Sequence, residues 1–303
     1  MTNSRRNFIK NSALAAAGVM VAPSGIFASA KAKSLIGVQL YSVRADMKAN
    51  PIATLEQLAK IGYKHVEHAN YANRKFYGYA PTEFKKILDG FGLQMPSGHS
   101  MLEIKHWDAA KKDFTDEWKY TVEDAATAGM QYVISPWLDD ELRASYDAMR
   151  GFADVFNKSG ALCNKYGMKF GYHNHNFEFT KNLKGHSIYE ILLEHTDPAA
   201  VFLQLDMGNI YGTGADPIAI VKNNPGRFLS VHVKDEIKAT EPGESQYESC
   251  VLGKGFAGTK EITALCASVG GTKHFIVEQE SYQGQTPLAA VKQDLAILKS
   301  WGY

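Results

Sequence analysis

The sequence predicts a single-domain α/β fold, the (β/α)8 or TIM barrel, and three observations lead to it. Short apolar segments rich in β-branched and aromatic residues alternate with longer amphipathic segments through residues 31–303. The short segments number eight, which favours closure of a parallel sheet into a barrel. No GxGxxG or phosphate-binding-loop pattern follows the first segment, so the rival doubly wound sheet lacks its usual signature.

The expected elements follow one another in strict alternation. Pro51 and Pro81 mark two helix starts, and glycines such as Gly62 and Gly129 mark helix ends. The expected strands are 35–41, 65–68, 93–99, 132–135, 169–173, 201–206, 228–233 and 274–278. The expected helices are 52–61, 82–91, 107–128, 141–166, 187–194, 216–222, 259–269 and 287–301. Residues 236–258 lack periodicity and are interpreted as a long loop on the active-site rim.

Residues 1–30 are expected to be an export signal that is removed. Arg5-Arg6 is followed by Phe8, an apolar stretch covers residues 13–22, and Ala28-Ser29-Ala30 supplies small residues for cleavage. The paired arginines resemble a twin-arginine signal. The apolar stretch is shorter than the roughly 18–20 residues that a membrane span requires. The sequence therefore predicts an exported, periplasmic protein with its catalytic domain in residues 31–303 and no stable membrane span.

Charge and cysteine content exclude several classes of protein. The 33 basic and 32 acidic residues nearly balance, so no global field favours nucleic acid or an anionic membrane. Cys163, Cys250 and Cys266 form an odd, sparse set without CxxC spacing. Such a set is neither a disulfide framework nor a zinc knuckle.

Polar residues gather where the expected strands end, which is where a barrel of this kind carries its active site. Seven of the eight strands end in groups that titrate, coordinate or form hydrogen bonds. These groups are Gln39, Tyr41, Arg44, Glu67, His68, His99, His173, His175, Asp206, Asn209, His232, Lys234, Asp235, Glu278 and Glu280.

Asp206, His232 and Glu278 lie on three consecutive strands and together predict a divalent metal site. Each alone has an ordinary explanation: Asp206 can cap a turn, Glu278 can pair with a lysine, and a single histidine can be part of the rim. Because neighbouring strand ends lie close together, one ion can bridge all three. The combination of Asp, Glu and His suits Mn²⁺, Fe²⁺, Co²⁺ or Zn²⁺.

Five motifs carry a resemblance to a known superfamily. They are GVQLYSVR at 37–44, GYHNH at 171–175, LDMGN at 205–209, Gly226-Arg227 leading to VHVKD at 231–235, and VEQE at 277–280. As a set they resemble the xylose-isomerase-like barrels, which include sugar phosphate isomerases and epimerases, ketose 3-epimerases, inosose dehydratase and endonuclease IV. The resemblance covers essentially all of residues 31–303.

The resemblance implies a metal held by Glu, Asp, His and Glu from strands five to eight. The last three correspond to Asp206, His232 and Glu278, whereas His173 occupies the position of the first glutamate. The arrangement His173-Asn174-His175 resembles inosose dehydratase. Glu178 and His175 are alternative fourth ligands, and Glu178 lies near the position of a glutamate that contacts substrate in ketose epimerases.

The resemblance also implies removal of a proton next to a carbonyl, with the metal stabilising the enediolate. Glu278 is the candidate base, and His173 or Glu178 is the candidate for returning the proton. If the substrate has a leaving group β to the carbonyl, the same enediolate expels it, and the enzyme is a dehydratase or lyase. The residues expected to contact substrate are Gln39, Tyr41, Glu67, His99, Trp137, His175, Asn209, Lys234 and Glu280.

The expected partner is a small carbohydrate, a sugar or keto-sugar, and the oligomeric state stays open, a homo-oligomer included. A nuclease related to endonuclease IV is disfavoured by the balanced charge and the export signal. A non-catalytic exported sugar-binding barrel is disfavoured because Asp206, His232 and Glu278 are all present.

Overall fold

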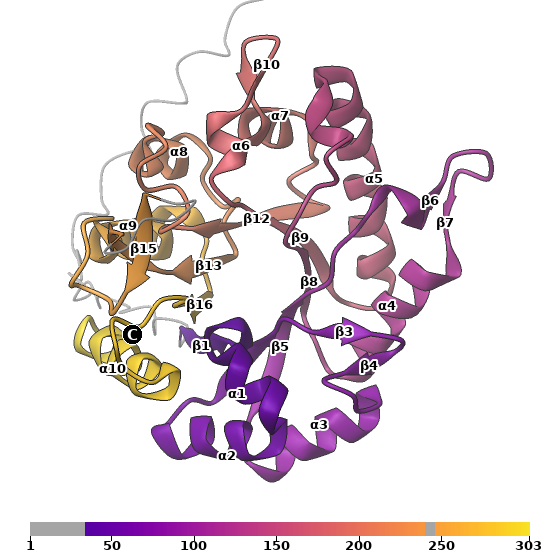
Figure 1. Ribbon diagram of the computed structural model, residues 1–303. Helices are drawn as coiled ribbons and strands as arrows, with labels where there is room; N and C mark the ends of the chain where they lie inside the picture. The colour runs from indigo at the N-terminus through magenta and orange to yellow at the C-terminus, as the bar shows by residue number, and fades with distance from the viewer. Residues whose placement is uncertain (1–33, 240–245) are drawn as a thin grey trace, which may run out of the picture. The chain divides into compact units, whose positions relative to one another are not determined.

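A computed structural model describes residues 34–239 and 246–303, so the predicted signal peptide at 1–30 lies outside the described residues. Eight parallel strands close into a barrel in the order β1-β16-β13-β12-β9-β8-β5-β2, viewed along its axis in Figure 1. The strands are β1 (Leu35–Gln39), β2 (His65–His68), β5 (Gln94–His99), β8 (Tyr132–Ser135), β9 (Lys169–His173), β12 (Val201–Asp206), β13 (Ser230–Val233) and β16 (His274–Val277). The predicted (β/α)8 barrel is confirmed.

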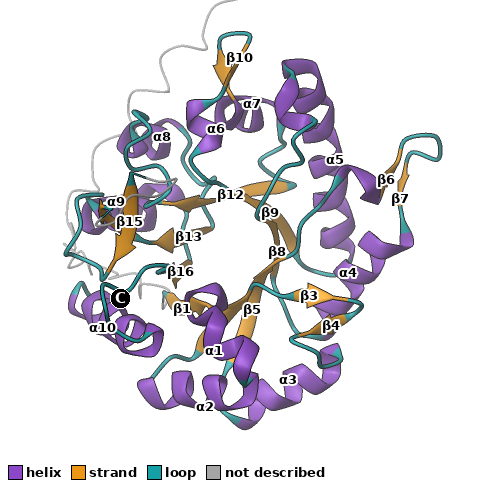
Figure 2. Ribbon diagram, viewed as in Figure 1, coloured by secondary structure: helices purple, strands orange, loops and turns teal. Residues whose placement is uncertain are grey.

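Helices surround the barrel, as Figure 2 shows. The longer ones are α2 (Pro51–Ile61), α3 (Pro81–Gly90), α4 (Asp116–Thr127), α5 (Tyr146–Lys165), α7 (Ile188–His195), α8 (Pro217–Asn223), α9 (Thr259–Leu265) and α10 (Pro287–Ser300). Shorter helical segments are η1 (Leu40–Val43), α1 (Arg44–Ala49), η2 (Ile104–His106), η3 (Leu142–Ala144), α6 (Phe177–Thr180) and the π-helical turn η4 (Cys266–Gly270). None of the helices in the described ranges is both long and apolar enough to cross a membrane.

Capping side chains explain where several helices begin. Asn50 accepts a hydrogen bond from the Ala53 backbone N–H ahead of α2, and Asp216 accepts from Ile218 and Ala219 ahead of α8. Both helices have proline in the first turn, where its missing N–H costs nothing. Gly62 ends α2 in the left-handed conformation with φ 111°, which a residue with a side chain rarely adopts.

Short antiparallel hairpins extend the loops, and these correct two predictions. The predicted loop 236–258 contains the hairpin of β14 (Asp235–Lys238) and β15 (Tyr247–Cys250). The predicted helix 107–128 begins only at Asp116, because β6 (Trp107–Asp108) and β7 (Asp113–Phe114) pair first. Two further hairpins are β3 (Tyr71–Ala72) with β4 (Lys75–Phe76) and β10 (Asn182–Leu183) with β11 (His186–Ser187). Their two-residue pairings were too short to give a period-two pattern.

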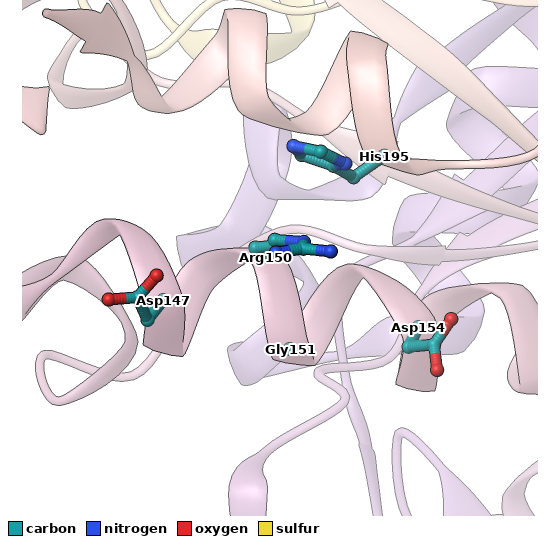
Figure 3. Close-up of a pocket in the computed structure, with 5 residues that line it drawn as sticks. All are labelled: Asp147, Arg150, Gly151, Asp154 and His195. Carbon is teal, nitrogen blue, oxygen red and sulfur yellow. The ribbon is translucent and has the colours of Figure 1, made fainter. Parts of the chain in front are cut away.

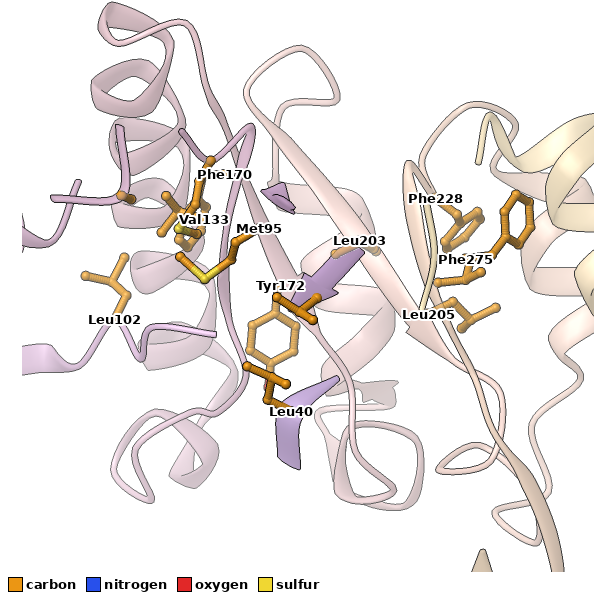
Figure 4. Packing of buried hydrophobic residues seen from close by; sticks show 14 of the residues in the cluster. Leu40, Met95, Leu102, Val133, Phe170, Tyr172, Leu203, Leu205, Phe228 and Phe275 are labelled. Carbon is orange, nitrogen blue, oxygen red and sulfur yellow. The ribbon is translucent and has the colours of Figure 1, made fainter. Parts of the chain in front are cut away.

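The main hydrophobic core lies between the barrel and its helices (Figure 4). Phe170 and Tyr172 of β9 point outward and pack on Phe156 of α5. The three cysteines, Cys163, Cys250 and Cys266, are buried free thiols. Burial of this apolar surface is the main term that stabilises the barrel.

The barrel interior changes from apolar to polar along its axis. At one end, Tyr132, Ile134 and Phe202 form a small separate cluster. Gly171 leaves room for the Phe202 ring, because a Cβ at this position would lie 2.5 Å from it. Two residues further along β12 comes Gln204, and then Asp206 at the strand end. Alternate residues of a strand point to the same side, so Phe202, Gln204 and Asp206 all point into the barrel. The apolar cluster therefore lies beneath Gln204, and Gln204 lies beneath the site.

Candidate active site

Four side chains from consecutive strands converge at the carboxyl end of the barrel. His173 ends β9, Asp206 ends β12, His232 lies in β13, and Glu278 follows β16. One potential ligand atom from each lies within 4.8 Å of the others, and all four residues are buried. The structure thus brings together the four residues predicted to hold a metal.

His232 is oriented by carboxylates on both edges of its ring. Its Nε2 lies 2.6 Å from Glu67 Oε1, while its Nδ1 faces Glu278 Oε2 at 3.0 Å and Asp206 Oδ2 at 3.6 Å. Although burial opposes a charge, the carboxylates of Glu278 and Glu67 raise the pKa of His232 well above its usual value. The environment of this ring therefore favours positive charge.

His173 is oriented by a residue that the sequence analysis missed. Its Nδ1 lies 3.1 Å from Gln204 Oε1, which leaves Nε2 available to a ligand. Gln204 Oε1 also accepts from His99 Nε2 at 2.8 Å, and Gln204 Nε2 donates to Ser230 Oγ at 2.9 Å. Gln204 had one detectable signal: it is the polar residue within the otherwise apolar run VFLQL.

Asp206 presents one carboxylate oxygen that accepts no hydrogen bond. Oδ1 accepts from the Asn209 backbone N–H at 2.8 Å, whereas the buried Oδ2 has no hydrogen bond. Burial opposes ionisation of Asp206, but Lys234 and His232 hold its pKa below the usual value. Asn174 fixes the backbone here by pairing with both the N–H and the C=O of Asp206. An orphaned, ionised oxygen among three other donors fits a cation.

Gln39 and Glu67 were expected to contact substrate, and the structure places them beneath the site instead. Both are fully buried, and neither lines the pocket. Glu67 accepts from Gln39 Nε2 at 2.8 Å, Ser97 Oγ at 2.6 Å and Gln204 Nε2 at 3.0 Å. Despite the opposing effect of burial, neighbouring His99 and His232 lower the pKa of Glu67. Glu67 thus stays charged and orients His232.

A pocket of about 500 Å³ opens above the four converging residues. It is lined by seven of the predicted site residues, namely Tyr41, His99, Trp137, His173, His175, Glu278 and Glu280. It is also lined by residues that the sequence analysis missed, including Asn70, Tyr71, Ser100 and Met101. These lie on the loops after β2 and β5, where no motif pointed to them.

Lys234 neutralises the carboxylates at the edge of this pocket. Its buried Nζ donates to Glu280 Oε1 and to Asn209 Oδ1, the latter at 3.0 Å, and lies 3.7 Å from Glu278 Oε2. Burial opposes its charge, yet Asp206 and Glu280 raise the pKa of Lys234. Lys234 and Asn209, both expected to contact substrate, line a neighbouring hollow of about 240 Å³ instead of this pocket, and Glu280 lines both.

Glu178, a candidate for catalysis and for the fourth ligand, lies apart from the converging residues. It accepts from Tyr172 Oη and, at 2.8 Å, from the His175 backbone N–H. Tyr172 points out of the barrel toward Phe156, so Glu178 lies behind the strand and outside the pocket lining. Burial raises the pKa of Glu178 to about 7. Its contacts fix the loop that carries His175.

His175, the other alternative ligand, lines the pocket without joining the four-residue group. It packs edge-on against the Trp137 ring with centroids 4.8 Å apart.

A further hollow, drawn in Figure 3, lies between α5 and α7 and is lined by Asp147, Arg150, Gly151, Asp154 and His195. It contains none of the predicted site residues, because these all come from the barrel strands and their loops.

A family model described as the xylose isomerase-like TIM barrel matches residues 55–301. An inosose dehydratase of Clostridium beijerinckii is 26% identical over 192 residues, which are 60% of this chain and 62% of that protein. The match thus spans about three fifths of that relative's length. A crystal structure of a sugar phosphate isomerase/epimerase from Parabacteroides distasonis has a TM-score of 0.74 at 27% identity, covering 90% of this chain and 96% of that one. The structure of an IolI protein with bound zinc shares the fold, with a TM-score of 0.68, 15% identity and coverage of 88% and 97%.

Proposed function

Because the chain belongs to the xylose isomerase-like TIM barrel family, we propose that it is a metal-dependent isomerase or epimerase of a sugar or keto-sugar. The reaction begins with removal of a proton next to a carbonyl and proceeds through an enediolate. The observation that carries this proposal is the convergence of His173, Asp206, His232 and Glu278 within 4.8 Å beneath an open pocket. Similarity to a sugar phosphate isomerase/epimerase at 27% identity supports it.

The donor set fits one divalent cation. Two imidazoles and two carboxylates suit Mn²⁺, Co²⁺, Zn²⁺ or Fe²⁺ better than ions that prefer oxygen ligands alone. Asp206 Oδ2 accepts no hydrogen bond, and Glu67 fixes the ring of His232 in the way that carboxylates orient metal-binding histidines. When bound, such an ion supplies stabilisation for the negative charge that develops on the enediolate oxygens.

Other side chains in and beside the pocket provide proton transfer, charge neutralisation and substrate binding. Glu278 lines the pocket and accepts the proton from carbon, while His173, with Nδ1 on Gln204, would hold the ion through Nε2. Lys234 stays within 3.7 Å of Glu278 Oε2 and offsets the charge of the carboxylates. Tyr41, His99 and His175 offer hydrogen bonds to hydroxyl groups, and Trp137 offers a ring face to the sugar.

The test measures bound metal and proton exchange in the purified protein and three variants. We expect one tightly bound divalent ion per chain in the wild type, lost in Asp206→Ala and His232→Ala. His186→Ala is the matched control, since His186 lies in the β10–β11 hairpin, away from the pocket. The wild type should incorporate solvent deuterium next to the carbonyl of a keto-sugar. Wild-type protein that neither holds nor takes up Mn²⁺, Co²⁺ or Zn²⁺ would rule the proposal out.

A dehydratase or lyase is the second candidate, and the similarity to inosose dehydratases favours it. The same proton leaves carbon, but the enediolate then expels a β-hydroxyl, which leaves as water with one proton from the protein. The product is an unsaturated ketone. Incubation with inososes distinguishes the candidates, because elimination raises absorbance in the ultraviolet and epimerisation does not. If the wild type binds sugars but catalyses neither reaction, the chain is a non-catalytic sugar-binding barrel.

We also propose that the protein is exported and that its partner is a small carbohydrate rather than nucleic acid. The support for export is the segment from Arg5-Arg6 to Ala28-Ser29-Ala30. The support for a carbohydrate is the mixture of aromatic and polar groups in a pocket of about 500 Å³. Near-equal numbers of basic and acidic residues weigh against nucleic acid.

A further inference from the structure

A second hollow of about 410 Å³ opens beside the candidate active-site pocket. Tyr71, Ser100 and Met101 line both cavities, so the two lie side by side at the barrel mouth. The hollow on the other side, near Lys234, shares only Glu280 with the pocket. The hollow toward Tyr71 therefore shares more of its wall with the candidate active-site pocket than the hollow near Lys234 does.

The walls of the second hollow are held rigidly. Their residues come from the η2 turn and from the β3–β4 hairpin and α4, which are labelled in Figure 1. Tyr71 Oη donates to Asp124 Oδ2 at 2.6 Å, and Arg74 donates to both oxygens of the same carboxylate at 3.0 and 2.7 Å. Asp124 is buried in α4, so these bonds fasten the hairpin to the helix. A ligand entering the hollow meets a surface that is already formed.

The lining suits a neutral polyhydroxylated ring. Tyr120 is 40% exposed, and the Arg74 guanidinium lies 4.2 Å from its ring centroid. Glu103 and Glu117 supply carboxylate acceptors, and His106 is held between them. Flat surfaces combined with a few polar groups are typical of small-ligand sites.

The same lining disfavours an anionic ligand such as a sugar phosphate. The guanidinium of Arg74 is committed to Asp124 through Nε and Nη2. The lysine beside the lining glutamates, Lys105, is committed as well, to Glu103 at 2.7 Å and to Glu117 at 3.7 Å. A neutral sugar ring needs neither cation, and it satisfies hydrogen bonds at its hydroxyls.

From this geometry we propose that the hollow lined by Tyr71, Arg74 and Tyr120 is a second sugar subsite. The substrate is a two-ring glycoside, with one ring at His173 and Glu278 and the other against Tyr120. This inference rests on the proposed function for the reacting ring and adds the class of substrate that the site selects.

The test compares one-ring and two-ring sugars in calorimetric titrations of the intact protein. The probes are glucose and a set of glucose disaccharides with α and β linkages. We expect at least one disaccharide to bind at least about tenfold more tightly than glucose, which corresponds to about 1.4 kcal/mol. Tyr120→Ala should remove that difference and leave glucose affinity unchanged, whereas Tyr120→Phe should keep most of it.

Two results overturn the inference. One is a wild type in which no disaccharide binds more tightly than glucose. The other is a Tyr120→Ala variant that keeps the preference for two rings. Failure of the proposed function appears separately, as absence of bound metal and of deuterium exchange in the wild type. Tyr120 is 40% exposed on α4, and unfolding followed by circular dichroism checks that the variant is folded.

Discussion

Glu67 Oε1 lies 2.6 Å from His232 Nε2, on the ring edge opposite Glu278 and Asp206. A carboxylate in this position fixes which nitrogen of the imidazole carries the proton and which faces the ligands. Glu67 is itself held by Gln39, Ser97 and Gln204, so the orientation of His232 depends on a buried network outside the pocket lining.

Glu67→Gln should therefore weaken metal binding without removing any ligand. We expect roughly a 10–100-fold loss of affinity, the usual effect of losing an outer carboxylate partner. Competition titration with a chelator measures it, and Glu56→Gln, a surface change on α2, is the matched control. Equal metal affinity in Glu67→Gln and the wild type would contradict this role of the carboxylate.

Two glycines of α5 should respond to alanine in opposite directions. At Gly160 a Cβ would lie 2.3 Å from the Ala200 carbonyl oxygen, which belongs to the backbone and yields little. Gly160→Ala should cost about 1–3 kcal/mol through overpacking. At Gly151 a Cβ would meet nothing within 4 Å, so Gly151→Ala should stabilise by about 0.5–1 kcal/mol. Urea denaturation measures both, and changes of the same sign would refute the packing argument.

The fold could be predicted from sequence where periodicity is strong. The apolar run 201–206 and the segment 169–173 match β12 and β9, because every residue of these strands except Lys169 is buried. The predicted strand boundaries were wrong where a turn interrupts an apolar pattern. Leu40 and Tyr41 were included in the first strand, but Gln39 caps a 3₁₀ turn and accepts from the Tyr41 backbone N–H. Apolar spacing cannot show that a local hydrogen bond ends a strand.

The sequence could predict which strand-end residues form the site, but not the hydrogen-bond network that joins them. Asp206 and His232 were predictable because they follow apolar runs on adjacent strands. Residue spacing says nothing about depth, so Gln39 and Glu67 were expected in the pocket although they lie below it. Glu178 was misplaced because the chain turns into α6 after β9, which carries its carboxylate to Tyr172 on the outer face.

Export should depend on the paired arginines. Replacing Arg5 and Arg6 together by lysine should block export in a bacterium that has the twin-arginine route, because that route recognises the pair. Cell fractionation measures it, with Lys10→Arg as the control that keeps both arginines. N-terminal sequencing of exported protein should begin at Lys31. Exported protein that retains residues 1–30 would contradict cleavage after Ala30.

Asp294 in α10 should make stability fall as pH rises. Burial raises the pKa of Asp294 to about 7; its Oδ1 accepts from the Leu252 backbone N–H at 2.9 Å, and its Oδ2 has no partner. The folded protein therefore keeps a proton that the unfolded chain releases near pH 4. Because the folded state binds more protons between these values, the contribution is greatest below about pH 4, declines up to about pH 7 and then stays low.

Asp294→Asn should remove this pH dependence, since the amide oxygen still accepts from Leu252 and carries no charge. The free energy of unfolding of the variant relative to wild type should rise between pH 4 and pH 8 by up to about 4 kcal/mol. Urea denaturation at several pH values measures the difference, which cancels the titration of other groups. Asp89→Asn, a change at an exposed carboxylate, is the control and should show little pH dependence. A difference that stays constant with pH would mean that Asp294 is ionised in the folded protein throughout this range.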